Sequence, residues 1–324
     1  MSKTLPDRLE SAEAVVAGSS RSEAMLVDLA RDMLAEKVRA RRWKIFFRFL
    51  LVAFLLALLL LPLLGSLSGL GSSERHAAVV DIKGVISEGS PANANDIVRS
   101  LEAAFKDSRT EGVILRINSP GGSPVQSGIV FDEILRLRGM HPDTPLYAVV
   151  ADTCASGGYY IAAAADKIYA DRASIVGSIG VRLDSFGFVD AFDKLGVERR
   201  LITAGENKAL LDPFLPENPG HREHLQQLAD SVHEQFIDAV KRGRGERLAD
   251  DDSLFSGLFW TGQEALELGL VDELSNERAV AEDVLGVNKR VNFTIRQSPV
   301  EKLLNQVRLQ FSLFFSESRY PAYF

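Results

Sequence analysis

Hydrophobic residues along most of the chain fall into two alternating kinds of segment. Short strand-like patterns predict strands at 77–82, 112–117, 146–151, 167–170 and 199–202. Apolar residues at helical spacing predict helices at 96–105, 125–137, 156–165 and 224–240. Strands that alternate with helices in this way are typical of an α/β domain with a parallel sheet.

One apolar run is longer than a strand or a core helix requires. Residues Phe49 to Ser73 carry no formal charge, and a helix of that length spans the ~30 Å hydrocarbon core of a bilayer. Basic residues crowd the N-terminal flank of the run, whereas Glu74 and Arg75 are the first charges beyond it. The positive-inside bias therefore predicts an N-terminus in the cytoplasm and a main domain outside it. A leader of more than 40 residues fits an uncleaved signal anchor better than a cleaved signal peptide.

These patterns divide the chain into four parts. We predict a cytoplasmic segment at 1–44, a transmembrane anchor and tether at 45–70, an α/β domain at 71–290 and an amphipathic tail at 291–324. Gly and Ser residues at 65–73 suit a short flexible tether. The tail is too short and too charged to span a bilayer, so its apolar and aromatic residues suit a partner helix or an interface.

Composition and charge exclude several classes of protein. The chain has 324 residues, 46% hydrophobic and 25% charged, which is ordinary globular composition. Its net charge is -7, and the part beyond residue 48 is the more acidic, which argues against nucleic-acid binding. Cys154 is the only cysteine, so an intrachain disulfide and a cysteine-based zinc site are both excluded. We predict no cofactor and no metal.

Two glycine-containing segments follow predicted strands and could carry chemistry. In Asn118-Ser-Pro-Gly-Gly, the glycines let backbone N–H groups face a cavity, so the turn either forms an oxyanion hole or is an ordinary strand-to-helix turn. Ser156, where a helix begins, is either a nucleophile or a simple N-cap. Cys154 is better explained as a small buried apolar residue than as the nucleophile.

A base for such a serine has two possible sources. Lys208, in Gly-Glu-Asn-Lys, is a surface lysine unless burial lowers its proton affinity enough for it to accept the serine proton. A serine, histidine and aspartate triad is the alternative, since triads are assembled in space. The sequence offers five histidines, each explicable as a surface residue: His76, His141, His221, His224 and His233.

Several motifs, in order along 77–288, resemble the signal peptide peptidase A family in its short, single-repeat form. They are Asn118-Ser-Pro-Gly-Gly, Ala155-Ser-Gly-Gly-Tyr-Tyr-Ile-Ala-Ala, Asp166-Lys-Ile-Tyr-Ala, Gly177-Ser-Ile-Gly-Val and Thr261-Gly-Gln-Glu-Ala-Leu-Glu-Leu-Gly-Leu-Val-Asp. The resemblance implies an α/β fold of the Clp protease/crotonase type, with repeated β-β-α units and one N-terminal transmembrane helix.

The resemblance also implies a Ser-Lys dyad. The nucleophile would be Ser156 and the general base Lys208, with the Ser178 hydroxyl orienting the lysine. The N–H groups of Gly122 and Gly157 would form the oxyanion hole.

The implied activity is that of a membrane-anchored serine endopeptidase. It would cleave hydrophobic peptides, remnant signal peptides first, through an acyl-enzyme. The family implies a homo-oligomer, a tetramer or octamer ring in the bacterial inner membrane with a periplasmic catalytic domain, whose dyad can join adjacent subunits. The alternatives are a quality-control protease acting on membrane proteins and a non-catalytic membrane scaffold. A crotonase-type acyl-CoA enzyme is disfavoured, because coenzyme A is not expected outside the cytoplasm.

Overall fold

The computed structural model describes residues 36–37, 39, 41–56 and 74–295, and the chain divides into two units between Ser73 and Glu74. In the first unit, residues 41–56 are helical and their side chains are exposed. Among the described residues, no helix is both long enough and apolar enough to cross a membrane. Much of the predicted anchor, at 57–73, and the predicted tail from 296 onward lie outside the described residues.

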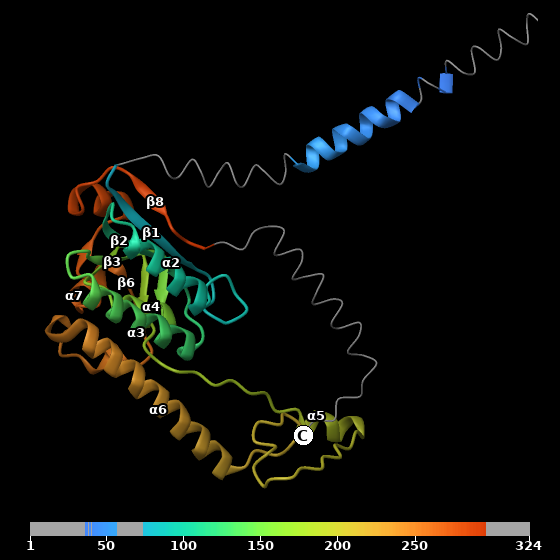
Figure 1. Cartoon of the computed structure of the whole chain (residues 1–324). Coiled ribbons are helices and arrows are strands. Elements are labelled where there is room, and N and C mark those ends of the chain that lie inside the picture. The colour runs from blue at the N-terminus through green and yellow to red at the C-terminus, as the bar shows by residue number, and fades with distance from the viewer. Residues whose placement is uncertain (1–35, 38, 40, 57–73, 296–324) are drawn as a thin grey trace, which may run out of the picture. The chain divides into compact units, whose positions relative to one another are not determined.

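The second unit is built on one mixed sheet of eight strands, ordered β6-β5-β3-β2-β1-β8 along its main path (Figure 1). Strand β4 pairs with β3 and β7 beside that path, and only the β5–β6 pair is antiparallel. The strands are β1 His76–Lys83, β2 Thr110–Ser119, β3 Leu146–Ala155, β4 Lys167–Ala170, β5 Ile175–Gly177, β6 Phe259–Thr261, β7 Glu273–Leu274 and β8 Arg290–Asn292.

Helices connect the parallel strands, as the chirality and length of such crossovers require. They are α2 Ala94–Lys106, α3 Pro124–Met140, α4 Gly157–Ala162, α5 Val189–Leu195, α6 Pro219–Arg244, α7 Gly262–Glu267 and α8 Glu277–Ala279. Two 3₁₀ turns, Gly245–Arg247 and Asp252–Phe255, and a π-helical turn, Val280–Val284, complete the described elements. The order begins β-α-β-α-β-α-β-β, so the mixed α/β class is confirmed but a uniform β-β-α repeat is not observed.

The central strands are buried on both faces. In β1, Val80 and Ile82 belong to the main core under the helices, whereas Ala77 and Val79 belong to a second apolar cluster on the opposite face. A strand that is covered on both faces can be apolar at every position. This burial explains why the central strands were visible as continuous apolar runs in the sequence.

Residues 181–218, here called the arm, run away from the sheet and return through α6 (Figure 1). Most arm residues are exposed, and the C-terminal half of α6 packs back on the body, where Phe236 stacks on Tyr160 of α4 at 4.9 Å. The predicted strand at 199–202 lies on the arm and is not a strand. No described strand runs beside it to supply ladder hydrogen bonds, so its sequence pattern has no sheet to join.

Candidate active site

Ser156 occupies a strained turn between β3 and α4. Its backbone has φ 51° and ψ -123°, a conformation that is costly for any residue with a side chain. The turn is held because the Ser156 N–H donates to the Gly177 carbonyl oxygen at 2.8 Å, and the Ser156 carbonyl accepts from the Tyr160 N–H at 2.9 Å. The side-chain hydroxyl makes no capping hydrogen bond. Ser156 therefore stands at the N-cap position of α4 without its hydroxyl capping the helix, and a strained strand-to-helix turn of this kind is one that can present a serine hydroxyl for nucleophilic attack.

The glycine turn after β2 packs directly against Ser156. A Cβ atom on Gly121 would lie 2.7 Å from the Ser156 Cβ, and one on Gly157 would lie 3.2 Å from the Gly122 nitrogen. Gly121 and Gly122 have φ values of 103° and 152°. The turn and the start of α4 approach this closely because these positions have no side chain.

Two backbone donors next to Ser156 have no acceptor. Among the described residues, neither the Gly122 N–H nor the Gly157 N–H donates a hydrogen bond. Gly122 is exposed, and Ser156 is half-buried. The structure therefore brings together a serine hydroxyl and two unused N–H groups, the combination that stabilises an oxyanion in acyl transfer.

Ser178 lies beside the same turn. Residues Ala155 and Gly177 are paired on the parallel strands β3 and β5, so Ser156 and Ser178 each follow one member of the pair. Ser178 also has a positive φ, 54°, and its N–H donates to the Leu258 carbonyl at 2.6 Å. Sequence spacing alone could not have placed these two serines next to each other.

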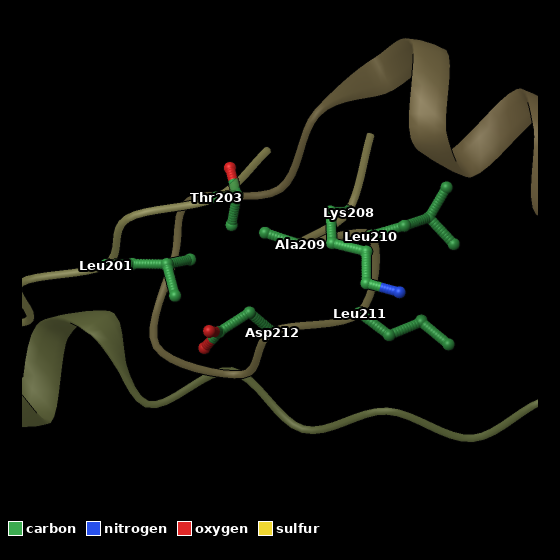
Figure 2. A pocket seen from close by; sticks show the side chains of 7 residues that line it. All are labelled: Leu201, Thr203, Lys208, Ala209, Leu210, Leu211 and Asp212. Carbon is green, nitrogen blue, oxygen red and sulfur yellow. The ribbon is translucent and has the colours of Figure 1, made fainter. Parts of the chain in front are cut away.

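Lys208 lies elsewhere in the single chain, on the arm. It is exposed, and its N–H donates to the Gly205 carbonyl at 3.2 Å. It lines a cavity of about 470 Å³ (Figure 2). The lining residues are Leu201, Thr203, Lys208, Ala209, Leu210, Leu211 and Asp212, none of which comes from the turn that holds Ser156.

A charged pair ties down the loop that carries Lys208. Arg199 donates to the Asp212 carboxylate at 2.8 Å, and the Phe214 N–H donates to the same carboxylate at 3.0 Å. The backbone hydrogen bond from Phe214, followed by that from Arg199, lowers the pKa of Asp212. The Asp212 carboxylate thus holds the loop through hydrogen bonds to Arg199 and Phe214, although the loop projects from the body.

Three of the five histidines lie in different parts of the domain. His233 lies near the site, with Nε2 3.1 Å from the Ile179 carbonyl, whereas His221 contacts Asn207 on the arm at 3.0 Å. His76 was expected on the surface, but it is 2% exposed because the start of β1 is covered by Phe293, which stacks on its ring at 5.8 Å.

Cys154 is fully buried, as expected, and burial raises the pKa of its thiol, so it is a poor nucleophile. No group of three or more His, Cys, Asp or Glu residues in the described part of the chain could hold a metal ion.

Comparison with known sequences agrees with this chemistry. Residues 140–290 match the model of peptidase family S49. A putative protease of Synechocystis is 31% identical over 64% of this chain and 72% of its own length. The putative signal peptide peptidase SppA of Enterococcus faecium is 27% identical over 69% of this chain and 67% of its own length.

A relative that is not named as a protease has a higher sequence identity to this chain than the two proteins above. A protein of Brucella abortus, named as the Na(+)/H(+) antiporter NhaA, is 49% identical over 186 residues. That match covers 57% of this chain but only 25% of the Brucella protein, so this chain spans about a quarter of that relative.

Proposed function

The chain belongs to peptidase family S49, the signal peptide peptidase A family, and from this we propose that it is a serine endopeptidase for hydrophobic peptides. The observation that carries the proposal is the strained Ser156 turn beside the free N–H groups of Gly122 and Gly157. Strain of this kind persists at sites where function needs the conformation.

The proposed reaction is acyl transfer through a Ser-Lys dyad. Neutral Lys208 accepts the proton of Ser156 Oγ while that oxygen attacks the peptide carbonyl carbon. The two glycine N–H groups hold the negative oxygen, and the C–N bond then breaks as the protonated lysine gives its proton to the leaving amine. Water, deprotonated by Lys208, hydrolyses the acyl-enzyme. The Ser178 hydroxyl orients the lysine amine.

This mechanism requires a second subunit, because Lys208 of one chain lies on the arm and away from its own Ser156. We propose that the dyad joins adjacent subunits of a homo-oligomeric ring, of four or eight chains. The arm supports this, because it exposes many large apolar side chains that a monomer would rarely leave in water. They are Leu183, Phe186, Phe188, Leu195, Val197, Leu201, Ile202 and Leu211, and Ile202 is 97% exposed.

The proposed location is the bacterial inner membrane, with the catalytic domain in the periplasm. The uncharged run from Phe49 to Ser73 and its basic flank support an anchor. Tethering would concentrate the site near membrane-embedded peptides, so remnant signal peptides are the first substrate class.

Mixing two inactive variants tests the activity and the assembly together. Ser156→Ala and Lys208→Ala chains, detergent-solubilised at full length, should each fail to cleave a fluorogenic signal peptide. Dissociated and reassembled at equal amounts, they should recover activity at roughly a quarter of the sites, since a random ring pairs one intact serine with one intact lysine at that frequency. Full hydrolysis by Ser156→Ala would refute the mechanism, and no recovery on mixing would refute the shared dyad.

A histidine base is the competing mechanism, and His233 is the residue that favours it. Its ring reaches the carbonyl of Ile179, the residue after Ser178, within one chain. The variant His233→Gln keeps a hydrogen-bonding side chain at this place. It should retain most activity if Lys208 is the base, whereas loss of activity as complete as in Ser156→Ala would favour histidine.

Assays with different substrates distinguish two further hypotheses about the function. A quality-control protease would cleave unfolded membrane proteins in preference to signal peptides, so both substrates should be assayed side by side. A non-catalytic scaffold would cleave neither, and its Ser156→Ala variant would still assemble.

A further inference from the structure

Ser119, the last residue of β2, makes two hydrogen bonds, one with the glycine turn that follows it and one with the segment after β1. It is fully buried. Its hydroxyl donates to the Gly84 carbonyl at 2.7 Å and accepts from the Gly121 N–H at 3.1 Å. One side chain thus connects the turn after β2 to the segment that follows β1.

Ile86, in the segment that follows β1, also makes backbone hydrogen bonds with the glycine turn. The Ile86 N–H donates to the Gly121 carbonyl at 2.9 Å, and the Ser123 N–H donates to the Ile86 carbonyl at 2.8 Å. A Cβ atom on Gly122 would lie 2.1 Å from the same Ile86 oxygen. The N–H groups of Gly121 and Ser123 therefore both have acceptors, whereas the Gly122 N–H between them has none among the described residues.

Ser119 also contacts the start of α4. A Cβ atom on Gly158 would lie 3.2 Å from the Ser119 carbonyl oxygen and 3.4 Å from its Cβ. Gly158 follows Gly157, which supplies the second unused donor. Ser119 therefore contacts Gly121 and Gly158, the residues that adjoin the two unused donors, Gly122 and Gly157. Because Ser119 is fully buried, it does not itself contact a bound peptide.

We propose that Ser119 is a positioning residue that fixes the direction of the Gly122 N–H toward the oxyanion. This inference rests on the proposed peptidase activity. The hydroxyl acts through Gly84 and Gly121 and never touches substrate. Because the oxyanion forms only as the carbonyl is attacked, a misdirected donor lowers kcat and leaves substrate binding nearly intact.

A buried serine with the same bonding pattern provides a matched control. Ser100 on α2 is 1% exposed, and its hydroxyl donates to the Asp96 carbonyl at 2.6 Å and accepts from the Ile295 N–H at 3.0 Å. It contributes nothing to the turn around Ser156. Ser119→Ala and Ser100→Ala therefore each delete one buried hydroxyl with one donated and one accepted bond.

Measurements of kcat and KM on the full-length protein should distinguish the two variants. Both should lose thermal stability, whereas only Ser119→Ala should lower kcat, by about 10-fold to 100-fold, with KM changed less than about 2-fold. Ser119→Thr, which keeps the hydroxyl, should restore most of kcat. A peptide aldehyde, whose adduct needs the oxyanion hole, should bind Ser119→Ala more weakly in the same proportion, while the corresponding peptide alcohol should bind equally well.

Amide hydrogen exchange tests the positioning without any need for activity. Peptic fragments that contain residues 118–123 should exchange faster in Ser119→Ala than in Ser100→Ala or the parent chain. Equal kcat losses in the two alanine variants, or unchanged exchange at 118–123, would overturn the inference. Failure of the proposed function looks different, because the parent chain would then cleave no peptide, or would cleave as well with Ser156→Ala, and the exchange result would still judge the role of Ser119.

Discussion

The buried guanidinium of Arg244, at the end of α6, lies 2.6 Å from the carboxylate of Asp272, which precedes β7. The same arginine donates to the Gly269 carbonyl at 2.7 Å, and Asp272 accepts from the Ile168 N–H of β4 at 2.7 Å. Burial alone would raise the pKa of Asp272, but the hydrogen bond and charge of Arg244 lower it overall. One ion pair therefore ties the helix that returns from the arm to the sheet.

Removal of the arginine from this pair should destabilise the fold strongly. Arg244→Ala leaves the largely buried Asp272 carboxylate with only the Arg247 guanidinium, 3.4 Å away, as a cationic partner. The free energy of unfolding should therefore fall by about 3 kcal/mol in chemical denaturation, the lower end for a broken buried pair. Arg278→Ala breaks a helical surface pair with Glu282 and should cost about 0–1 kcal/mol. Equal losses in the two variants would contradict the assigned role of the buried pair.

Stability should depend on pH through Asp107. Side-chain hydrogen bonds from Arg109 lower the pKa of this carboxyl from 3.8 to about 2, against the raising effect of burial. A depressed folded pKa stabilises the fold above the unfolded pKa, and that stability is lost as the pH falls from about 4 to about 2. Asp107→Asn should therefore be less stable than the parent chain at pH 7, by a margin that shrinks toward pH 2 in urea titrations. Asp143→Asn, at an exposed position, controls for the loss of one charge.

Gly122→Ala should abolish most activity through a backbone collision. The added methyl group would lie 2.1 Å from the Ile86 carbonyl oxygen, so the turn must move and its N–H with it. We expect kcat to fall by about 100-fold or more. Gly139→Ala, in α3 with nothing within 4 Å of the added atom, should keep full activity and gain up to about 1 kcal/mol of stability. Normal turnover by the Gly122 variant would show that this donor is dispensable.

Ser156→Gly should make the protein more stable and inactive. Glycine accepts φ 51° and ψ -123° without the side-chain penalty, so the free energy of unfolding should rise by about 1–2 kcal/mol. Ser156→Ala keeps the strain and should show no such gain, although it is equally inactive. The melting temperatures of the two variants provide the comparison, and identical values would argue that the turn is unstrained.

The local hydrophobic pattern was sufficient to predict the central strands and helices of the fold. The run at 112–117 reads as a strand because β2 is apolar toward both covered faces, and burial on two faces leaves a continuous signal. The helix expected from 156 to 165 begins at Gly157 and ends at Ala162, because its last turn tightens before β4. The pattern at 199–202 failed because a strand also needs a neighbour, and neighbours are supplied by topology.

For the candidate site, too, some features were visible in the sequence and others only in the folded chain. Sequence alone singled out Ser156 and the Gly121–Gly122 turn as candidates, because serine and glycine at strand ends are conspicuous whatever the fold, but it left an N-cap and an ordinary turn as alternatives, and their catalytic roles stay a prediction. Ser119 belongs to the Asn118-Ser-Pro-Gly-Gly motif, but its proposed role depends on Gly84, 35 positions earlier in the chain, and no local pattern indicated that contact. The pairing of β3 with β5 put Ser178 beside Ser156, and the projecting arm put Lys208 at a distance within the single chain. Local composition determines which residues can act, whereas closeness between residues far apart in sequence depends on strand pairing and packing, which only the folded chain decides.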